Sequence, residues 1–319
     1  MASREELERL DRLLSKQEKR VRDAFMEFVR QARSDEVLRE VGDMLERGDI
    51  NGAMGVVDRY IGALGSVLPS AFIDVGVATA AELADKLPKG QFGIHFDPTH
   101  PRAAEIMRQN RLEFVTEFSE EQRRATRAAL VRAFETGQGS LGVARAFRDS
   151  IGLTETQEGA VANYERLLRA GSREVLDRAL RDRRFDGTVS RAIANDEALS
   201  ETQIDRMVSR YRERYLSYRS QVIARTEALR ATSQAREEAT IQTAEQADIP
   251  QSQIKRVWNT TVDGRTREWH ASMQGQVRAV NEAFVDGHGN RLLYPGDPAA
   301  PMETTVSCRC VLTTEFELG

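Results

Sequence analysis

The stretch that decides the fold is residues 200–246, SETQIDRMVSRYRERYLSYRSQVIARTEALRATSQAREEATIQTAEQ. Its apolar residues recur at steps of three and four: Ile204, Val208, Tyr211, Tyr215, Tyr218, Val222 and Leu229. This period predicts one helix of roughly 60–70 Å, at 1.5 Å of rise per residue. Ser200 and Gln203 form a capping box at its start. A helix of this length must cross a domain or bridge two.

Further helices are predicted on the N-terminal side of this stretch. Two more capping boxes, Ser119…Gln122 and Thr154…Gln157, mark helix starts. Three glycines mark helix stops: Gly137, Gly152 and Gly171. The expected helices lie near 119–136, 140–151, 154–170 and 172–183.

The first helix is predicted at residues 3–33. Its apolar stripe repeats every seven residues at Leu7, Leu14, Val21 and Phe28. This helix either packs on its own domain or forms a coiled-coil contact with another chain, because four heptads suffice for both.

Two or three helices are expected within residues 35–87, with breaks at Gly48-Asp49 and Pro69 and an N-cap at Asp49. Residues 88–101 carry three prolines and two glycines, which predicts a loop or extended segment and a boundary between domains.

The sequence pattern changes after Pro250. Residues 253–262 are rich in β-branched and aromatic residues, and Asp263-Gly264 and residues 287–290 are turn signals. We therefore expect a mainly α protein, in which an elongated multi-helix region leads through a long helix to a small α+β domain of short strands. The predicted segments are 1–100, 101–250 and 251–319.

Composition limits the class of protein. Charged residues make up 30% and aromatic residues 6%, and the formal net charge of −4 carries no sign of polyanion binding. No run of 18 apolar residues is apparent, so no transmembrane helix is expected. The charged N-terminus argues against a secretory signal. Two cysteines without such a signal indicate a reducing compartment and no disulfide framework.

The two cysteines, Cys308 and Cys310, lie two residues apart near the C-terminus. In a strand, residues at this spacing point to the same face, so both sulfurs could meet one partner. With His270 they form a ligand set for structural zinc, for which Asp263, His288 and Asp297 are candidate fourth ligands. The alternative is that both cysteines pack as small apolar residues and that no cofactor is bound.

Two other groups of polar residues are candidates for a catalytic or docking role. The turn Asp263–His270 could place a histidine base near a cysteine nucleophile, but no elbow or oxyanion loop accompanies it. The alternative is a turn capped by Asp263, with Arg265 or Arg267 paired to a carboxylate. In the long helix, Arg225 and Glu227 do not face each other, so each would anchor a different neighbour. Arg225 could dock on the Asp263 turn or on the C-terminal domain.

Six short pieces of sequence occur in a fixed order across the C-terminal part of the chain: Arg225-Thr226-Glu227, Trp258-Asn259-Thr260, Asp263-Gly264-Arg265, His270, Gly275-Gln276 and Cys308-Arg309-Cys310. In this order they resemble the phage Mu F-like minor head proteins, also called head morphogenesis proteins. Two positions depart from the family pattern. Ser307 stands where Asn is usual, and Met273-Gln274 stands where Leu-Asp is common. The missing Asp removes one metal or hydrogen-bond partner near His270.

The resemblance implies a structural protein of tailed phages that acts in procapsid assembly, with DNA packaging or delivery near the portal as a further role. Its implied partners are the portal protein, the major capsid protein or both, and packaged DNA, with no membrane. Its implied location is the virion, at the capsid interior or portal vertex, and the host cytoplasm during assembly. Arg225, Glu227, Trp258, Asp263, Arg265, Gly275 and Arg309 are the expected structural or docking residues.

Catalysis is not expected from this resemblance. Some relatives carry toxin domains after this module, but only nine residues follow Cys310, and we expect no such domain here. The alternative is a Cys/His or metal-dependent hydrolase, of nuclease type, in residues 253–319. It requires His270 and a cysteine to be exposed together in a pocket.

Overall fold

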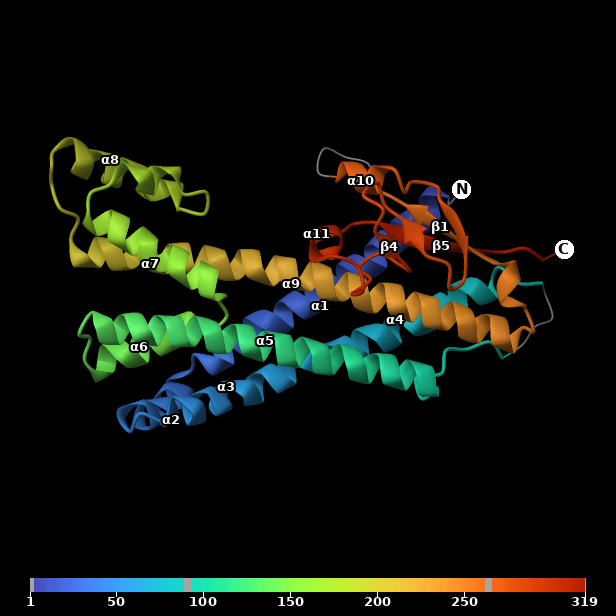
Figure 1. Ribbon diagram of the computed structural model, residues 1–319, viewed down its shortest axis with the longest axis horizontal. Helices are drawn as coiled ribbons and strands as arrows, with labels where there is room; N and C mark the ends of the chain where they lie inside the picture. The colour runs from blue at the N-terminus through green and yellow to red at the C-terminus, as the bar shows by residue number, and fades with distance from the viewer. Residues whose placement is uncertain (1–2, 89–92, 262–265, 319) are drawn as a thin grey trace. The chain divides into compact units, whose positions relative to one another are not determined.

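The computed structural model describes residues 3–88, 93–261 and 266–318, and 68% of the chain is helical (Figure 1). The helices are α1 (Arg4–Ala32), α2 (Asp35–Glu46), α3 (Ile50–Gly65), α4 (Val67–Ala84), α5 (Pro101–Glu135), α6 (Ser140–Ser150), α7 (Glu155–Arg169), α8 (Asp186–Ala194), α9 (Glu201–Gln246), α10 (Glu268–Ala271) and α11 (Met302–Thr305). The prediction of a mainly α chain with a small α+β C-terminal part is confirmed.

Helix α9 confirms the helix predicted at 200–246, and Figure 1 shows it as one continuous ribbon. The capping box is formed, since Gln203 N donates to Ser200 Oγ (3.3 Å) and Ser200 N donates to Gln203 Oε1 (2.9 Å). The predicted apolar seam is only partly right, because Tyr218 is 52% exposed. A stripe drifts around a straight helix over many turns. Leu229 of the predicted seam is buried, but so are positions outside it, among them Arg219, Ser220, Ala224, Ala228 and Ala231.

The residues group into two compact units. One contains Met1–Ala24, Gly65–Phe114 and Gln221–Gly319, and the other contains Phe25–Leu64 and Val115–Ser220. The units interleave along the chain, whereas the predicted segments follow one another. Helices α1, α5 and α9 each contribute residues to both units.

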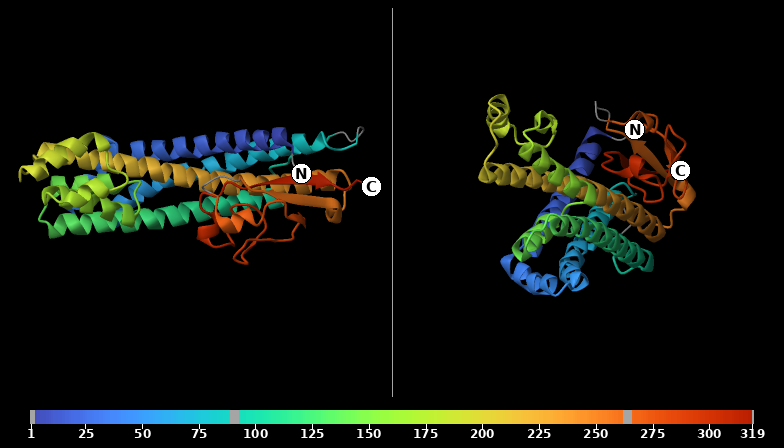
Figure 2. Two further views of the ribbon diagram at one scale, coloured as in Figure 1. Left: turned by 90° about the horizontal axis from the view of Figure 1, so that it is seen from above. Right: turned by 60° about the vertical axis from the view of Figure 1, so that its left-hand side comes forward.

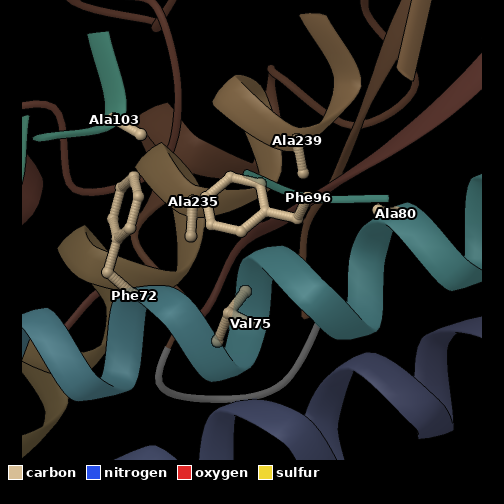
Figure 3. Packing of buried hydrophobic residues seen from close by; sticks show 7 residues of the cluster. All are labelled: Phe72, Val75, Ala80, Phe96, Ala103, Ala235 and Ala239. Atoms are coloured by element: carbon tan, nitrogen blue, oxygen red, sulfur yellow. The ribbon is translucent and has the colours of Figure 1, made fainter. Parts of the chain in front are cut away.

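The first unit has a core made largely of small side chains. Phe72, Val75 and Ala80 of α4 pack with Phe96, Ala103, Ala235 and Ala239 (Figure 3). Phe72 and Phe96 have ring centroids 5.9 Å apart. Gly76 leaves the space that Phe96 fills, because a Cβ at this position would lie 2.5 Å from that ring. The Gly- and Ala-rich composition therefore permits close approach between a helix and an aromatic ring.

The stripe of α1 packs within the chain. Leu10, Leu14 and Val21 are buried in the first unit, and Phe25 and Phe28 are buried in the second. In the second unit, the rings of Phe25 and Phe28 both meet Phe118 edge-on. This burial supports the interpretation that the helix predicted at 3–33 packs within its own chain.

Three predicted boundaries are wrong. The Ser119…Gln122 pair lies inside the 35-residue helix α5 and starts no helix. The helix predicted at 172–183 is instead two 3-10 turns, η1 (Arg173–Asp177) and η2 (Arg183–Phe185), followed by α8. Between α3 and α4 the break falls at Ser66 and not at Pro69. Pro69 lies in the first turn of α4, where its missing N–H has no intrahelical partner to lose.

By length and composition, one helical stretch in the described part of the chain would suffice to cross a membrane. It is Ile50–Ala84, with a mean hydropathy of 1.6, and 44% of its apolar window is buried. It consists of two helices, α3 and α4, and Glu82 of α4 is ion-paired to Arg236 at 3.1 Å. One such stretch is weak evidence for a membrane span, because the buried core helices of folded proteins pass the same test of length and composition.

The C-terminal residues form a module of short antiparallel strands. β1 (Ile254–Asn259) is the centre of a three-stranded sheet, between β2 (Val277–Ala279) and β5 (Val311–Phe316). Its register with β5 runs from Ile254↔Phe316 to Asn259↔Val311. A second ribbon pairs β3 (Phe284–Val285) with β4 (Arg291–Leu292). Figure 2 shows this module, in orange and red, alongside the C-terminal part of α9.

Candidate functional site

His270 lies on the single-turn helix α10, inside the module. Its amide donates to Arg267 O (3.0 Å), and its carbonyl accepts a hydrogen bond from Thr260 Oγ1 (3.0 Å). Thr260 directly follows β1, so the central strand fixes the position of the histidine. The side chain is 3% exposed.

Cys308 and Cys310 lie in a bend that immediately precedes β5. The prediction placed them within the closing strand, and this is corrected: β5 begins at Val311. The bend is set by Ser307, whose φ of 54° is in the left-handed region. Ser307 N donates to Thr226 Oγ1 on α9 (3.3 Å), which ties the bend to the long helix.

The bend turns both sulfurs toward the same imidazole nitrogen. Cys308 Sγ and Cys310 Sγ each lie 3.5 Å from His270 Nδ1, and the three donor atoms lie within 4.8 Å of one another. Cys310 N also approaches Cys308 Sγ, at 3.4 Å. The two cysteines are 2% and 3% exposed, so the group is closed to bulk water.

Hydrogen bonding within this group shifts the pKa values of the two thiols in opposite directions. The hydrogen bond from Cys308, helped by one from His270, lowers the pKa of Cys310 to about 5 against the opposing effect of burial. The same hydrogen bond to Cys310, together with burial, raises the pKa of Cys308 well above its usual value. The group therefore favours one thiolate beside one thiol over two neutral thiols.

Two of the three candidate fourth ligands, His288 and Asp297, are held away from this group. His288 is exposed, and its ring stacks on Trp269 with centroids 4.5 Å apart. Asp297 caps a loop, because its two oxygens accept the amides of Leu293 (2.7 Å) and Ala299 (2.9 Å). Asp263 lies outside the described residues, as does Arg265.

Trp258 and Gly275 lock the central strand to the turn that carries His270. Gly275 N donates to Trp258 O (2.8 Å), and Trp258 N donates to Gln276 O (2.9 Å). The φ of Gly275 is +76°, a value that favours glycine. The Trp258 side chain is fully buried against Phe284, and Gln274 Oε1 accepts the amide of Thr260 (2.6 Å). The side-chain amide of Gln274 therefore supplies a hydrogen-bond acceptor near His270, at the position where the family commonly has Asp.

Arg225 and Glu227 take different partners among the described residues. Arg225 Nε and Nη2 donate to Glu18 of α1 at 3.1 and 3.3 Å. Glu227 lies 3.7 Å from Arg230 on the same helix. Arg309 lies between the two cysteines, and its carbonyl accepts a hydrogen bond from Thr261 Oγ1 (3.0 Å). The contact between α9 and the C-terminal bend is made by Thr226, the neighbour of Arg225.

Arg256 is an organising residue that the sequence patterns did not single out. It is 1% exposed, and it donates to Glu237 Oε1 (3.0 Å) and to three carbonyls, of Leu293 (2.8 Å), Ala279 (2.7 Å) and Glu282 (2.6 Å). Only the alternation of a strand, which puts position 256 on the same face as Ile254 and Trp258, could have suggested burial. From the sequence alone, an arginine at this position would be expected to be exposed, because the acceptors that make its burial favourable come from other segments.

The fold and the site together define a helix-rich protein with a small α+β module that encloses both of its thiols. The chain belongs to the family of phage Mu protein F like proteins, whose family model matches residues 124–313, more than half of the chain. It is therefore a structural head morphogenesis protein of a bacteriophage, which interacts with other head components in the virion and during assembly in the host cytoplasm. No curated protein matches the chain, and no solved structure does.

Ser307 has a backbone conformation in the left-handed region, and it stands where the family usually has Asn. A substitution at this position tests the effect of that difference. Asn tolerates left-handed φ better than Ser, so Ser307→Asn should raise the free energy of unfolding by about 0.5–1 kcal/mol. The matched control is Asn281→Ser, at a residue whose φ is 69°. This change should lower the free energy of unfolding by a similar amount. Urea unfolding measures both, and a destabilising Ser307→Asn would show that the serine side chain itself is required.

Proposed function

We propose that this protein is a minor head protein that acts in procapsid assembly at the portal vertex. The observation that carries the proposal is the family match over 124–313, together with the contacts that join the family's sequence pieces into one module. Thr226 on α9 accepts the amide of Ser307, while Trp258 exchanges two backbone hydrogen bonds with Gly275 and Gln276. A module closed in this way suits a protein that must hold its shape while it is built into a larger shell.

The partners we propose are the portal protein and the major capsid protein, with the capsid interior or portal vertex as the location. Contact with packaged DNA has weaker support, since the formal net charge is −4 and phosphate contacts require clustered Lys and Arg. DNA packaging or delivery is therefore proposed as a consequence of placement near the portal and not of direct DNA binding.

The alternative function, a Cys/His hydrolase, has less support from the geometry. A nucleophile and its base must reach a substrate, yet His270, Cys308 and Cys310 are all at most 3% exposed. If this alternative is correct, His270→Ala and Cys310→Ala should abolish a measurable activity of the purified protein. If both variants leave every assayed activity unchanged, it fails.

The assembly role is tested on particles. Phage that lack the gene should form defective or non-infectious heads, and a wild-type copy supplied in trans should restore them. Quantitative mass spectrometry of purified virions should find the protein at low copy number. Cross-linking in procapsids should give peptides shared with the portal protein. An exhaustive particle proteome without the protein overturns the proposal, and cross-links confined to the major capsid protein would move the location away from the portal.

A further inference from the structure

We propose that His270 Nδ1, Cys308 Sγ and Cys310 Sγ bind a zinc ion that staples the C-terminal bend to the central part of the module. The three ligands come from two segments of the chain, the α10 turn and the residues just before β5. The inference stands apart from the proposed assembly role, because it concerns how the module is held closed and not what the protein contacts.

The spacing between each sulfur and the imidazole nitrogen matches that of a tetrahedral zinc site. With Zn–S bonds of about 2.3 Å and Zn–N bonds of about 2.0–2.1 Å, tetrahedral angles place sulfur and nitrogen about 3.5 Å apart. Both Sγ–Nδ1 distances are 3.5 Å. The two sulfurs also lie within 4.8 Å of each other, so all three atoms are close enough to share one cation.

The chemistry of the ligands selects zinc over harder cations. Two thiolates and one imidazole are soft or borderline donors, and Mg²⁺ and Ca²⁺ prefer oxygen ligands instead. Two thiolates also neutralise a divalent ion, which matters in a group that is at most 3% exposed. The amide of Cys310, 3.4 Å from Cys308 Sγ, offers a hydrogen bond to that sulfur and further stabilises its thiolate.

The module has a structural need for such a staple. The segment between β4 and β5 contains one short helix, α11, and the three strands of its main sheet are three to six residues long. Small domains with little regular structure often gain their stability from a metal or a cross-link. An ion on His270 and the two cysteines would join segments that are separated by 38 to 40 residues in sequence.

None of the described residues supplies the fourth ligand, and in this proposal a water molecule completes the site. Asp297 and His288 are held elsewhere, as described above, and in the part of the chain that the structure describes no further His, Cys, Asp or Glu joins the group. Thr260 Oγ1, 3.9 Å from Cys310 Sγ, offers a hydrogen-bond partner on that side of the site. The competing arrangement has no metal: the Cys310 thiol donates to Thr260 and the three side chains pack on one another.

The test is the metal content of the full-length protein, purified without chelator. We expect about one zinc per chain by mass spectrometry, and replacement by Co²⁺ should give a thiolate-to-cobalt charge-transfer band with the strong visible bands of a tetrahedral site. Cys308→Ser, Cys310→Ser and His270→Gln should each weaken zinc binding by at least about 100-fold. The matched control, His288→Gln, removes a nearby exposed histidine and should keep the zinc.

A second measurement keeps the proposal falsifiable if the cysteine variants do not fold. In the folded wild-type protein, a chelator should make both thiols reactive toward a thiol reagent and lower Tm, and added zinc should reverse both effects. A folded wild-type protein that holds no zinc and gives no cobalt bands after metal exchange overturns the proposal. Retention of a full zinc equivalent by Cys308→Ser or Cys310→Ser would also overturn it.

Discussion

Arg256→Met is expected to lower the free energy of unfolding of the C-terminal module by about 3–5 kcal/mol, the usual cost of breaking a buried ion pair from one side. The change leaves the Glu237 carboxylate buried without its cation. It also removes the guanidinium donor from the carbonyls of Leu293, Ala279 and Glu282, of which that of Ala279 keeps the amide of Glu282 (3.1 Å). Burial already raises the pKa of Glu237, and Arg256 opposes that rise. Without Arg256 this carboxyl should take up a proton at higher pH.

Tryptophan fluorescence during urea unfolding measures this effect, because both tryptophans, Trp258 and Trp269, lie in the module. The control is Arg291→Met, at an exposed position on β4, which should change the free energy by no more than about 0.5 kcal/mol. In a Glu237→Gln background, Arg256→Met should cost less, since no charge is left behind. A cost below about 1 kcal/mol in the wild-type background would contradict the role given to Arg256.

Gln122→Leu is expected to destabilise the second unit by about 1–3 kcal/mol, because it leaves the buried amide of Gly152 without its acceptor and removes a second hydrogen bond to Ser150. The Gln122 side chain is fully buried within α5. Its Nε2 donates to Ser150 O (3.1 Å), and its Oε1 accepts the amide of Gly152 (2.8 Å). Leucine has a similar size but leaves the amide of Gly152 unpaired, while the carbonyl of Ser150 keeps only the amide of Leu153 (3.1 Å) as a donor. Water cannot supply the lost hydrogen bonds, because the Gln122 side chain is fully buried.

Far-UV circular dichroism is the suitable measurement for this variant, since the second unit contains no tryptophan and is almost wholly helical. The unfolding transition seen by circular dichroism should shift to lower urea, and the fluorescence transition should shift less. Gln109→Leu, at an exposed position on the same helix, is the control and should be nearly neutral. Equal shifts for the two variants would mean that the buried hydrogen bonds add nothing.

Local sequence signals predicted the elements that depend on neighbouring residues alone. Thr154 and Gln157 close a capping box, Asp49 caps α3 through the amide of Gly52 at 2.8 Å, and α9 begins within one residue of the predicted start. The first strand was also predicted. These features need only the residues within a turn or a strand, so their outcome does not depend on the rest of the fold.

The same kind of signal was wrong where a distant segment offered a better partner. Ser119 and Gln122 have the spacing of a capping box, but Gln122 pairs with Ser150 and Gly152 instead, and α5 continues without a break. A side chain that can satisfy two buried backbone groups gains more than one that caps a helix already continued by its own hydrogen bonds.

The sequence by itself determined the helical class, the long α9, the small strand-bearing end and the phage Mu F-like family, because periodicity, caps and motif order are local properties. Only the tertiary structure decided where the chemistry lies. It placed His270 3.5 Å from each cysteine, buried Arg256 among four acceptors and joined Thr226 to Ser307. These contacts link residues 19 to 81 positions apart, and loop closure over such distances depends on every element between them.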